Sequence, residues 1–261
     1  MKHAIMGYWK NSKEPFFGDI GIILIVVLFI VGTTLSWVGY DEYQQVQESE
    51  YRLLESHARN ADSKITDMLN NIEHVLNQLA EEKLTSRSPQ NKAFAALLEQ
   101  HKKSILELGI VFITDAAGRI SHATDATIVG REISNQSYFS THKNTESSKL
   151  FMSRPDKDFF GVTSVIFSVP IFNSVHKFVG IVGVTIGYTF FPKVLQAINP
   201  EDSASMSVIF NHDGDLLYRR ENPEKFFGNN IIQVSVVLRE HFDAHRQVTR
   251  HISPSLHNGK L

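Results

Sequence analysis

A long apolar segment near the N-terminus dominates the hydrophobic pattern of the chain. Residues 20–38 carry no charged side chain and are rich in Ile, Val and Leu. As an α-helix this segment would be about 28 Å long, close to the ~30 Å hydrocarbon core of a bilayer. Trp37 and Tyr40 lie at its C-terminal edge, where aromatic rings favour the lipid headgroups. The pattern predicts a transmembrane helix over residues 20–40.

A cleaved signal peptide is the alternative for this segment. Its apolar core would be shorter, about 7–15 residues, and small residues would follow at the cleavage site. Here the bulky Trp37 stands where a peptidase prefers a small residue. An uncleaved anchor is therefore favoured.

The charges on either side of the span predict its orientation. Lysines precede it, and acidic residues follow it before the first basic residue. They are Lys2, Lys10 and Lys13 before the span, and Asp41, Glu42, Glu48 and Glu50 after it. Because Lys and Arg are held on the cytoplasmic side, we expect residues 1–19 in the cytoplasm and residues 41–261 outside.

The pattern after the span changes to a heptad repeat. Residues 41–83 contain no Pro and no Gly, and their apolar positions alternate four and three apart. These positions are Leu54, Ala58, Ala61, Ile65, Met68, Ile72, Val75 and Leu79. The spacing predicts a long stalk helix with a narrow apolar stripe. The stripe could pack along its own domain or pair with a second copy, and we favour a homodimer through this helix.

The next segments predict an α+β unit over residues 84–200. A polar loop with Pro89 precedes a second helix over 92–108. An apolar run at 110–113 and an Asp-x-x-Gly turn at 115–118 then predict a β-hairpin. Further elements follow: a short helix from Ser137 or Tyr138, strands within 148–155, 161–172 and 176–189, and a helix over 191–198. An antiparallel sheet with helices packed on it is an α+β layer.

An internal repeat predicts a second unit of the same design. Similar residue types recur at equivalent positions about a hundred residues apart. The equivalent pairs are Ile113 and Ile209, Asp115 and Asn211, Gly118 and Gly214, Ile120 and Leu216, Gly130 and Gly228, and Ile133 and Ile231. The unit would occupy residues 201–261, with a helix in 231–248 and a strand after it. Only 33 residues follow Gly228. We therefore expect an incomplete second sheet, and a receptor that is truncated before its output domain.

Composition and motifs exclude several function classes. The net charge is −2 with both signs interspersed, so no basic face indicates nucleic-acid binding. The chain has no cysteine, which fits an exported protein. His241 and His245 are spaced for one helix face, but Phe242 replaces the catalytic Glu of a zincin, so they are only a weak metal candidate. No catalytic motif is present, and we expect neither an enzyme nor a cofactor.

The order of these segments resembles the double Cache domain of bacterial transmembrane receptors. The resemblance rests on the anchor, the long exported helix and two PAS-like units that open with V-x-x-x-D-x-x-G-x-I. It also rests on VGREISNQSYF, LFMSRP and VPIFN…KFVGIVGVTIGY. It implies a receptor anchored in the bacterial inner membrane, with two tandem antiparallel-sheet units that lie in the periplasm or outside the cell. The closest likeness is to membrane-bound diguanylate cyclases and histidine kinases.

The resemblance also implies a small-molecule site in the first unit, with Tyr138 and Arg154 as its main candidates. Ser153, Ser168 and Thr185 complete the expected set. An Arg can hold a carboxylate bidentately, and a Tyr offers a ring face and a hydroxyl. The alternative is that Arg154 pairs with Asp156 or Asp158 while Tyr138 packs in the core.

Two departures from the family pattern bear on the ligand. Residues 135–137 read Asn-Gln-Ser where Asp-Arg is frequent, and Thr185 stands near an Asp that takes the amine of amino-acid ligands. Both count against a free amino acid and leave a small organic acid. We therefore expect an extracytoplasmic sensing module. The alternatives are a membrane-anchored structural protein assembled through its heptad helix, and an exported hydrolase.

Overall fold

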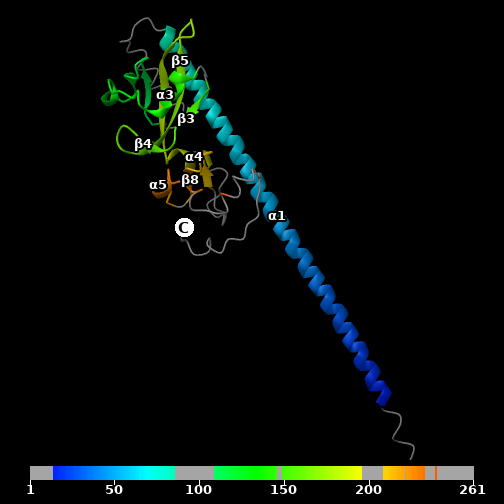
Figure 1. Ribbon diagram of the computed structural model, residues 1–261. Coiled ribbons are helices and arrows are strands. Elements are labelled where there is room, and N and C mark those ends of the chain that lie inside the picture. The colour runs from blue at the N-terminus through cyan, green and yellow to red at the C-terminus, as the bar shows by residue number, and fades with distance from the viewer. Residues whose placement is uncertain are drawn as a thin grey trace, which may run out of the picture. The chain divides into compact units, whose positions relative to one another are not determined.

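The computed structural model describes residues 14–85, 109–145, 149–195, 208–220, 222–232 and 239 (Figure 1). It divides the chain into two compact units, Met1–Arg59 and Asn60–Leu261. The second helix expected over 92–108, the pair His241 and His245, and the C-terminal strand all lie outside the described residues.

The transmembrane and stalk segments belong to one α-helix, α1 (Glu14–Thr85). By length and composition this helix can cross a membrane, a test that a signal sequence near an N-terminus also passes. Apolar side chains in the predicted span are exposed, among them Ile25, Phe29 and Trp37. Such exposure is expected of side chains that face lipid.

Within Asn60–Leu261, the first of the two repeat units is built on a six-stranded antiparallel sheet with strand order β2-β1-β6-β5-β3, and β4 also pairs with β5. The strands are β1 (Val111–Thr114), β2 (Ile120–Ala123), β3 (Phe151–Met152), β4 (Asp156–Lys157), β5 (Thr163–Phe172) and β6 (Phe178–Gly187). The helices around the sheet are η1 (Ala126–Ile128), α3 (Ser137–Asn144) and α4 (Phe190–Leu195). The expected hairpin, the helix from Ser137 and the long antiparallel pair are confirmed.

Alternate residues of β5 pack into two separate cores. Val165 and Phe167 pack with Ile72 and Leu76 of α1, whereas Ile166 packs with Phe139 of α3. Successive side chains of a strand point to opposite faces, so α1 and α3 cover opposite faces of the sheet (Figure 1). The apolar stripe of α1 is therefore buried in its own unit from Ile72 to Ala80, while Leu54 remains exposed.

The strand expected over 148–155 is shorter than the sequence indicated. Only β3 falls within the expected range, and β4 begins directly after it, beyond Pro155. Proline has no backbone N–H to donate to a sheet. At this interruption Ser153 Oγ accepts the N–H of Ile166 at 2.9 Å, a bond from side chain to backbone.

The internal repeat is present residue by residue in the second unit, which contains β7 (Val208–Phe210), β8 (Leu216–Arg219) and α5 (Pro223–Phe226). Asp115 N donates to Arg119 O at 2.9 Å, and Asn211 N donates to Asp215 O at 3.0 Å. The glycine nitrogen of the following loop donates to the strand at 2.8 Å in both units, Gly130 to Ile120 and Gly228 to Leu216.

The turn glycines explain why these positions repeat. Gly118, Gly130, Gly214 and Gly228 have φ values of 89°, 85°, 81° and 83°. Residues with a Cβ rarely adopt this left-handed conformation. The described segments thus confirm a mixed helix and antiparallel-sheet fold with a repeated hairpin motif.

Candidate ligand-binding site

A cavity of about 630 Å³ lies on the α3 side of the sheet. It is bounded by the loop before α3, the start of α3, the β3–β4 segment, β5, and two residues of the second unit. The lining residues are Arg131, Glu132, Ile133, Gln136, Ser137, Tyr138, Ser153, Arg154, Pro155, Asp156, Lys157, Asp158, Phe159, Ser164, Ile166, Asp215 and Gly228. Its volume is within the range of about 300–1,000 Å³ that is typical of small-molecule sites.

An aromatic cluster supports the apolar wall of the cavity, to which it contributes Tyr138 and Phe159, while Phe112 does not itself line the cavity. The Phe112 ring meets the rings of Tyr138 and Phe159 edge-on, with centroids 6.2 and 5.3 Å apart. Gly183 of β6 lies under the Phe112 ring, and a Cβ on Gly183 would overlap that ring. The glycine therefore makes room for the ring that supports Tyr138.

Tyr138 presents a neutral hydroxyl to this cavity. Burial, and then the nearby Asp156 carboxylate, raise the pKa of Tyr138 well above its usual value. Among the described residues its hydroxyl has no hydrogen-bond partner. A protonated phenol both donates and accepts, so Tyr138 can bind a polar group of an occupant.

Two serines on the cavity wall differ in their bonding. Ser153 Oγ donates to Arg154 O at 2.9 Å and accepts from Ile166 N, so its hydroxyl links the backbone after β3 to the backbone of β5. Ser164 is 4% exposed, and its Oγ has no hydrogen-bond partner in the described part of the chain. A hydroxyl both donates and accepts, so Ser164 is available to hydrogen-bond an occupant of the cavity.

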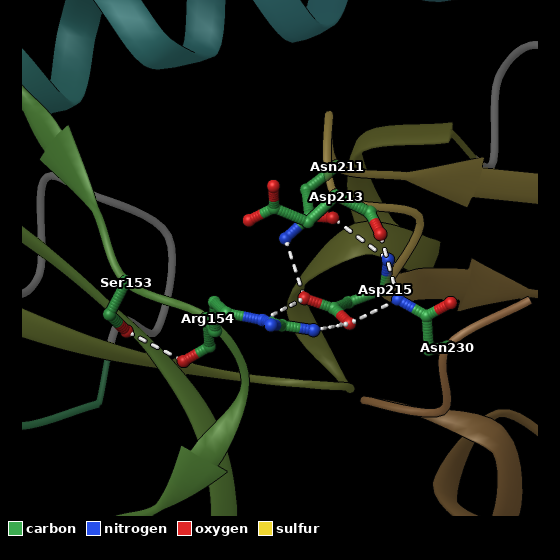
Figure 2. Close-up of polar contacts among 6 residues, drawn as sticks. All are labelled: Ser153, Arg154, Asn211, Asp213, Asp215 and Asn230. Carbon is green, nitrogen blue, oxygen red and sulfur yellow. Dashed lines mark hydrogen bonds and ion pairs between the residues drawn. The ribbon is translucent and has the colours of Figure 1, made fainter. Parts of the chain in front are cut away.

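The charged side of the cavity contains a bidentate ion pair between the two repeat units (Figure 2). Arg154 Nε donates to Asp215 Oδ2 at 2.9 Å, and Nη2 donates to Oδ1 at 2.7 Å. The Arg154 side chain is 64% exposed, whereas that of Asp215 is 3% exposed. Asn211 and Asn230 also donate to the carboxylate, at 3.1 and 3.0 Å.

These contacts fix the charge state of the pair. The hydrogen bonds from Arg154 and then from Asn230 and Asn211 lower the pKa of Asp215, although burial opposes them. The bond to Asp215 raises the pKa of Arg154. Both groups are therefore ionised at neutral pH.

The structure brings together three of the five site residues that the sequence indicated: Tyr138, Ser153 and Arg154 line the cavity. Ser168 and Thr185 do not line it. Ser168 is fully buried beside His142, with Oγ 3.0 Å from Nε2. Thr185 Oγ1 accepts the N–H of Ile110 at 2.7 Å, which holds β1 beside β6.

The alternative partners expected for Arg154 are wrong. Arg154 pairs with Asp215, which is 61 residues away in the chain, and not with Asp156 or Asp158. Asp158 Oδ1 instead accepts the N–H groups of Phe160 and Val162 at 2.9 Å and stabilises the turn before β5. The same alternative also expected Tyr138 to pack in the core. Tyr138 is buried in the core and also lines the cavity.

Sequence reasoning missed Ser164 and Asp215. Ser164 has the same parity along β5 as Ser168, so the alternation of the strand could have placed both on one face. Asp215 occupies the position of Arg119 in the repeat, and nothing in the sequence pairs it with Arg154.

The buried His142–Ser168 pair bears on the hydrolase alternative. Burial lowers the pKa of His142, although its hydrogen bond to the Ser168 backbone opposes that shift. His142 and Ser168 are 2% and 0% exposed, and neither lines the cavity. This pair supports the packing of α3 on β5.

No group of metal-ligating side chains occurs among the residues that the structure describes.

Ser164 and Ser168 of β5 give a test of which buried serine hydroxyl is hydrogen-bonded in the absence of a ligand. Ser164→Ala removes an unsatisfied hydroxyl and should leave the free energy of unfolding unchanged or slightly higher. Ser168→Ala removes a bonded hydroxyl and should lower that free energy by about 1 kcal/mol. Urea denaturation of both variants measures the difference. Equal destabilisation by the two substitutions would show that Ser164 is already satisfied.

The family model of the Cache domain, dCache_1, matches residues 43–251. The chain belongs to the Cache domain family. Members of this family have a PAS-like α+β fold, and the described repeat of the hairpin agrees with a double Cache domain. No curated protein matches the sequence.

Solved structures similar to this Cache domain come from bacterial sensors. The extracellular domain of the putative histidine kinase rpHK1S-Z16 has a TM-score of 0.62 at 20% identity, over 71% of this chain and 77% of that one. The ligand-binding domain of the Pseudomonas aeruginosa amino acid chemoreceptor PctC, solved with GABA, has a TM-score of 0.54 at 16% identity, over 69% and 80%.

An extracellular ligand-binding receptor from Desulfohalobium retbaense has a TM-score of 0.58 at 19% identity. The match covers 73% of this Cache chain but 33% of the receptor, so the chain spans about a third of that protein. At these identities the likeness shows the fold.

Proposed function

We propose that this chain is the extracytoplasmic small-molecule sensing module of a bacterial inner-membrane signalling receptor. The observation that carries the proposal is the 630 Å³ cavity on the first Cache unit, into which Tyr138 and the unpartnered Ser164 project. The similar structures support it because they are an extracellular ligand-binding receptor, a chemoreceptor ligand-binding domain in complex with GABA and the extracellular domain of a putative histidine kinase.

The proposed topology follows the charge pattern of the sequence. Residues 1–19 would lie in the cytoplasm, and residues 41–261 in the periplasm or outside the cell. The signal would pass to a diguanylate cyclase or histidine kinase output domain. A ligand can drive such a signal only if it binds two arrangements of the receptor with different affinity.

Dimerisation through α1 is part of the proposal. Within the unit Met1–Arg59, Tyr43, Val46, Leu53 and Leu54 are exposed at 59%, 54%, 54% and 49%. Beyond the membrane, large apolar side chains on a helix favour a partner surface. Of these side chains only Leu54 belongs to the predicted heptad stripe, and a second copy of the same helix would cover it there.

The ligand class is proposed from the polar groups of the cavity. The cavity lining contains four carboxylates, those of Glu132, Asp156, Asp158 and Asp215. Its cations are Arg131, Arg154 and Lys157, and Tyr138 and Ser164 supply hydroxyls. A small organic acid would satisfy these groups. The apolar wall of Phe159 and Ile166 would pack against its carbon chain.

A thermal-shift screen of the full chain in detergent tests the proposal. Small acids, amines and peptides are each added over a concentration series, and a ligand that reaches about 100 times its dissociation constant stabilises a folded protein by about 2.7 kcal/mol. For a domain of this size the melting temperature should rise by about 5 °C or more. Tyr138→Phe should reduce the shift, whereas Tyr40→Phe, an exposed control on α1, should leave it unchanged.

The same sample distinguishes the alternatives. Light scattering should give the mass of a dimer, and a monomer would contradict assembly through α1. A dimer that no compound stabilises would favour the structural protein. Turnover of a generic ester or peptide would favour the hydrolase.

A further inference from the structure

Arg154 connects the cavity to the second repeat unit. It follows β3 in the first unit and lines the cavity, yet its Nε and Nη2 groups both donate to Asp215. Among the described residues its Nη1 group has no partner. Figure 2 shows the guanidinium pointing from the β3–β4 segment toward the turn that contains Asp213 and Asp215.

Asp215 does not depend on Arg154 alone. Asn211 Nδ2 and Asn230 Nδ2 donate to its two oxygens at 3.1 and 3.0 Å. Asn211 Oδ1 in turn accepts the backbone N–H of Asp215 at 2.8 Å, so the amide is held in place. If Arg154 left, the buried carboxylate would keep two hydrogen-bond donors, which reduces the cost of its release.

Arg154 can leave more easily than Asp215 can. Its side chain is 64% exposed, so its movement into the cavity uncovers little buried surface. The Asp215 carboxylate is held by the hairpin β7–β8 and by Asn230 in the loop that follows α5. The mobile partner of this pair is therefore the one that faces the cavity.

We propose that Asp215 sets the affinity of the cavity for anionic ligands by competing with them for Arg154. The inference rests on the proposed function of the cavity as a ligand site. A ligand carboxylate near Arg154 and the Asp215 carboxylate repel each other, and one guanidinium neutralises only one of them. An anion that takes the Nε and Nη2 donors of Arg154 thus breaks the bidentate pair between the two units, whereas an anion bound through Nη1 alone would leave the pair intact.

The competition works in both directions. If Asp215 weakens anion binding, then a bound anion weakens the attachment of the second hairpin by the same factor. The hairpin would keep its apolar contacts, since Leu217, Tyr218 and Phe227 lie in the core that contains α1. The expected response is a local loosening of residues 208–232, with the unit still folded.

Acetate is the probe for this inference, with chloride at equal ionic strength as the reference, on the full chain in detergent. Asp215→Asn keeps the size of the side chain and removes its charge, so acetate should bind about tenfold more tightly by saturation-transfer NMR. Asp213 makes no hydrogen bond with Arg154, and its charge is the smallest of the causes that act on the Arg154 pKa, so Asp213→Asn should change the affinity less than twofold. Arg154→Gln should abolish acetate binding.

Hydrogen exchange on the wild-type chain gives a second measurement. Acetate should speed amide exchange within residues 208–232, including the bonded N–H groups of Leu216 and Gly228, and Arg154→Gln should remove this effect. Weaker or unchanged acetate binding by Asp215→Asn would overturn the inference. So would the absence of any acetate effect on exchange.

The inference and the proposed function can fail separately. A screened ligand that depends on Tyr138 but is indifferent to Asp215→Asn would keep the sensor and overturn the competition. Acetate binding that tightens in Asp215→Asn, with no screened ligand depending on Tyr138, would keep the competition and count against the sensor.

Discussion

Replacing Leu76 by alanine is expected to lower the free energy of unfolding of the Cache unit by about 3 kcal/mol. Leu76 is fully buried on the face of α1 that packs against β5 and β6. The substitution removes three carbon atoms from a core shared with Phe167 and leaves a cavity there. Urea denaturation of the full chain, followed by circular dichroism, measures the loss.

Leu84→Ala is the matched control for this substitution. Leu84 lies on the same helix and is 46% exposed, so its truncation should change the free energy of unfolding by less than about 0.5 kcal/mol. Similar losses at Leu76 and Leu84 would contradict the packing of α1 on the sheet. An unaffected Leu76 variant would do so as well.

Gly180→Ala is expected to destabilise the unit by a comparable amount, about 3 kcal/mol. Gly180 lies in β6 opposite Ile171 and has a φ of 146°, a region that residues with a Cβ rarely adopt. The added Cβ would also overlap the backbone carbonyl of Thr114 in β1. Strain and overpacking each cost about 1–3 kcal/mol, and neither backbone can move without breaking the sheet.

Gly187 provides the control within the same strand. A Cβ on Gly187 would meet no atom within 4 Å. Gly187→Ala should therefore change the free energy of unfolding by less than about 1 kcal/mol. If Gly180→Ala were as mild as Gly187→Ala in thermal unfolding, the close approach of β1 to β6 would be incorrect.

Most of the fold could be predicted from local sequence patterns. The Asp-x-x-Gly turns and the apolar runs around them fix the hairpins through short-range hydrogen bonds, so they could be recognised in the sequence. The two repeats match because Gly118 and Gly214 fill the same left-handed position. Ser153 and Pro155 were harder to interpret, because the break between β3 and β4 depends on a side-chain bond to Ile166.

The site was only partly predictable because it depends on tertiary contacts. Tyr138 and Arg154 were indicated by a family resemblance, whereas the ion pair of Arg154 with Asp215 joins residues of different repeats. Thr185 and Ser168 have the residue types of a polar site, but the close packing of β1 and α3 uses their hydroxyls. Sequence alone does not show which polar side chains already have hydrogen-bond partners within the fold.

The alternation of β5 has a mechanical consequence. Ser164 and Ile166 border the cavity, and Val165 and Phe167, their immediate neighbours, pack in the core with α1. A single strand thus separates an occupant of the cavity from the helix. Any tilt or shift of β5 forced by an occupant would press directly on α1, through covalently adjacent residues and without an intervening loop.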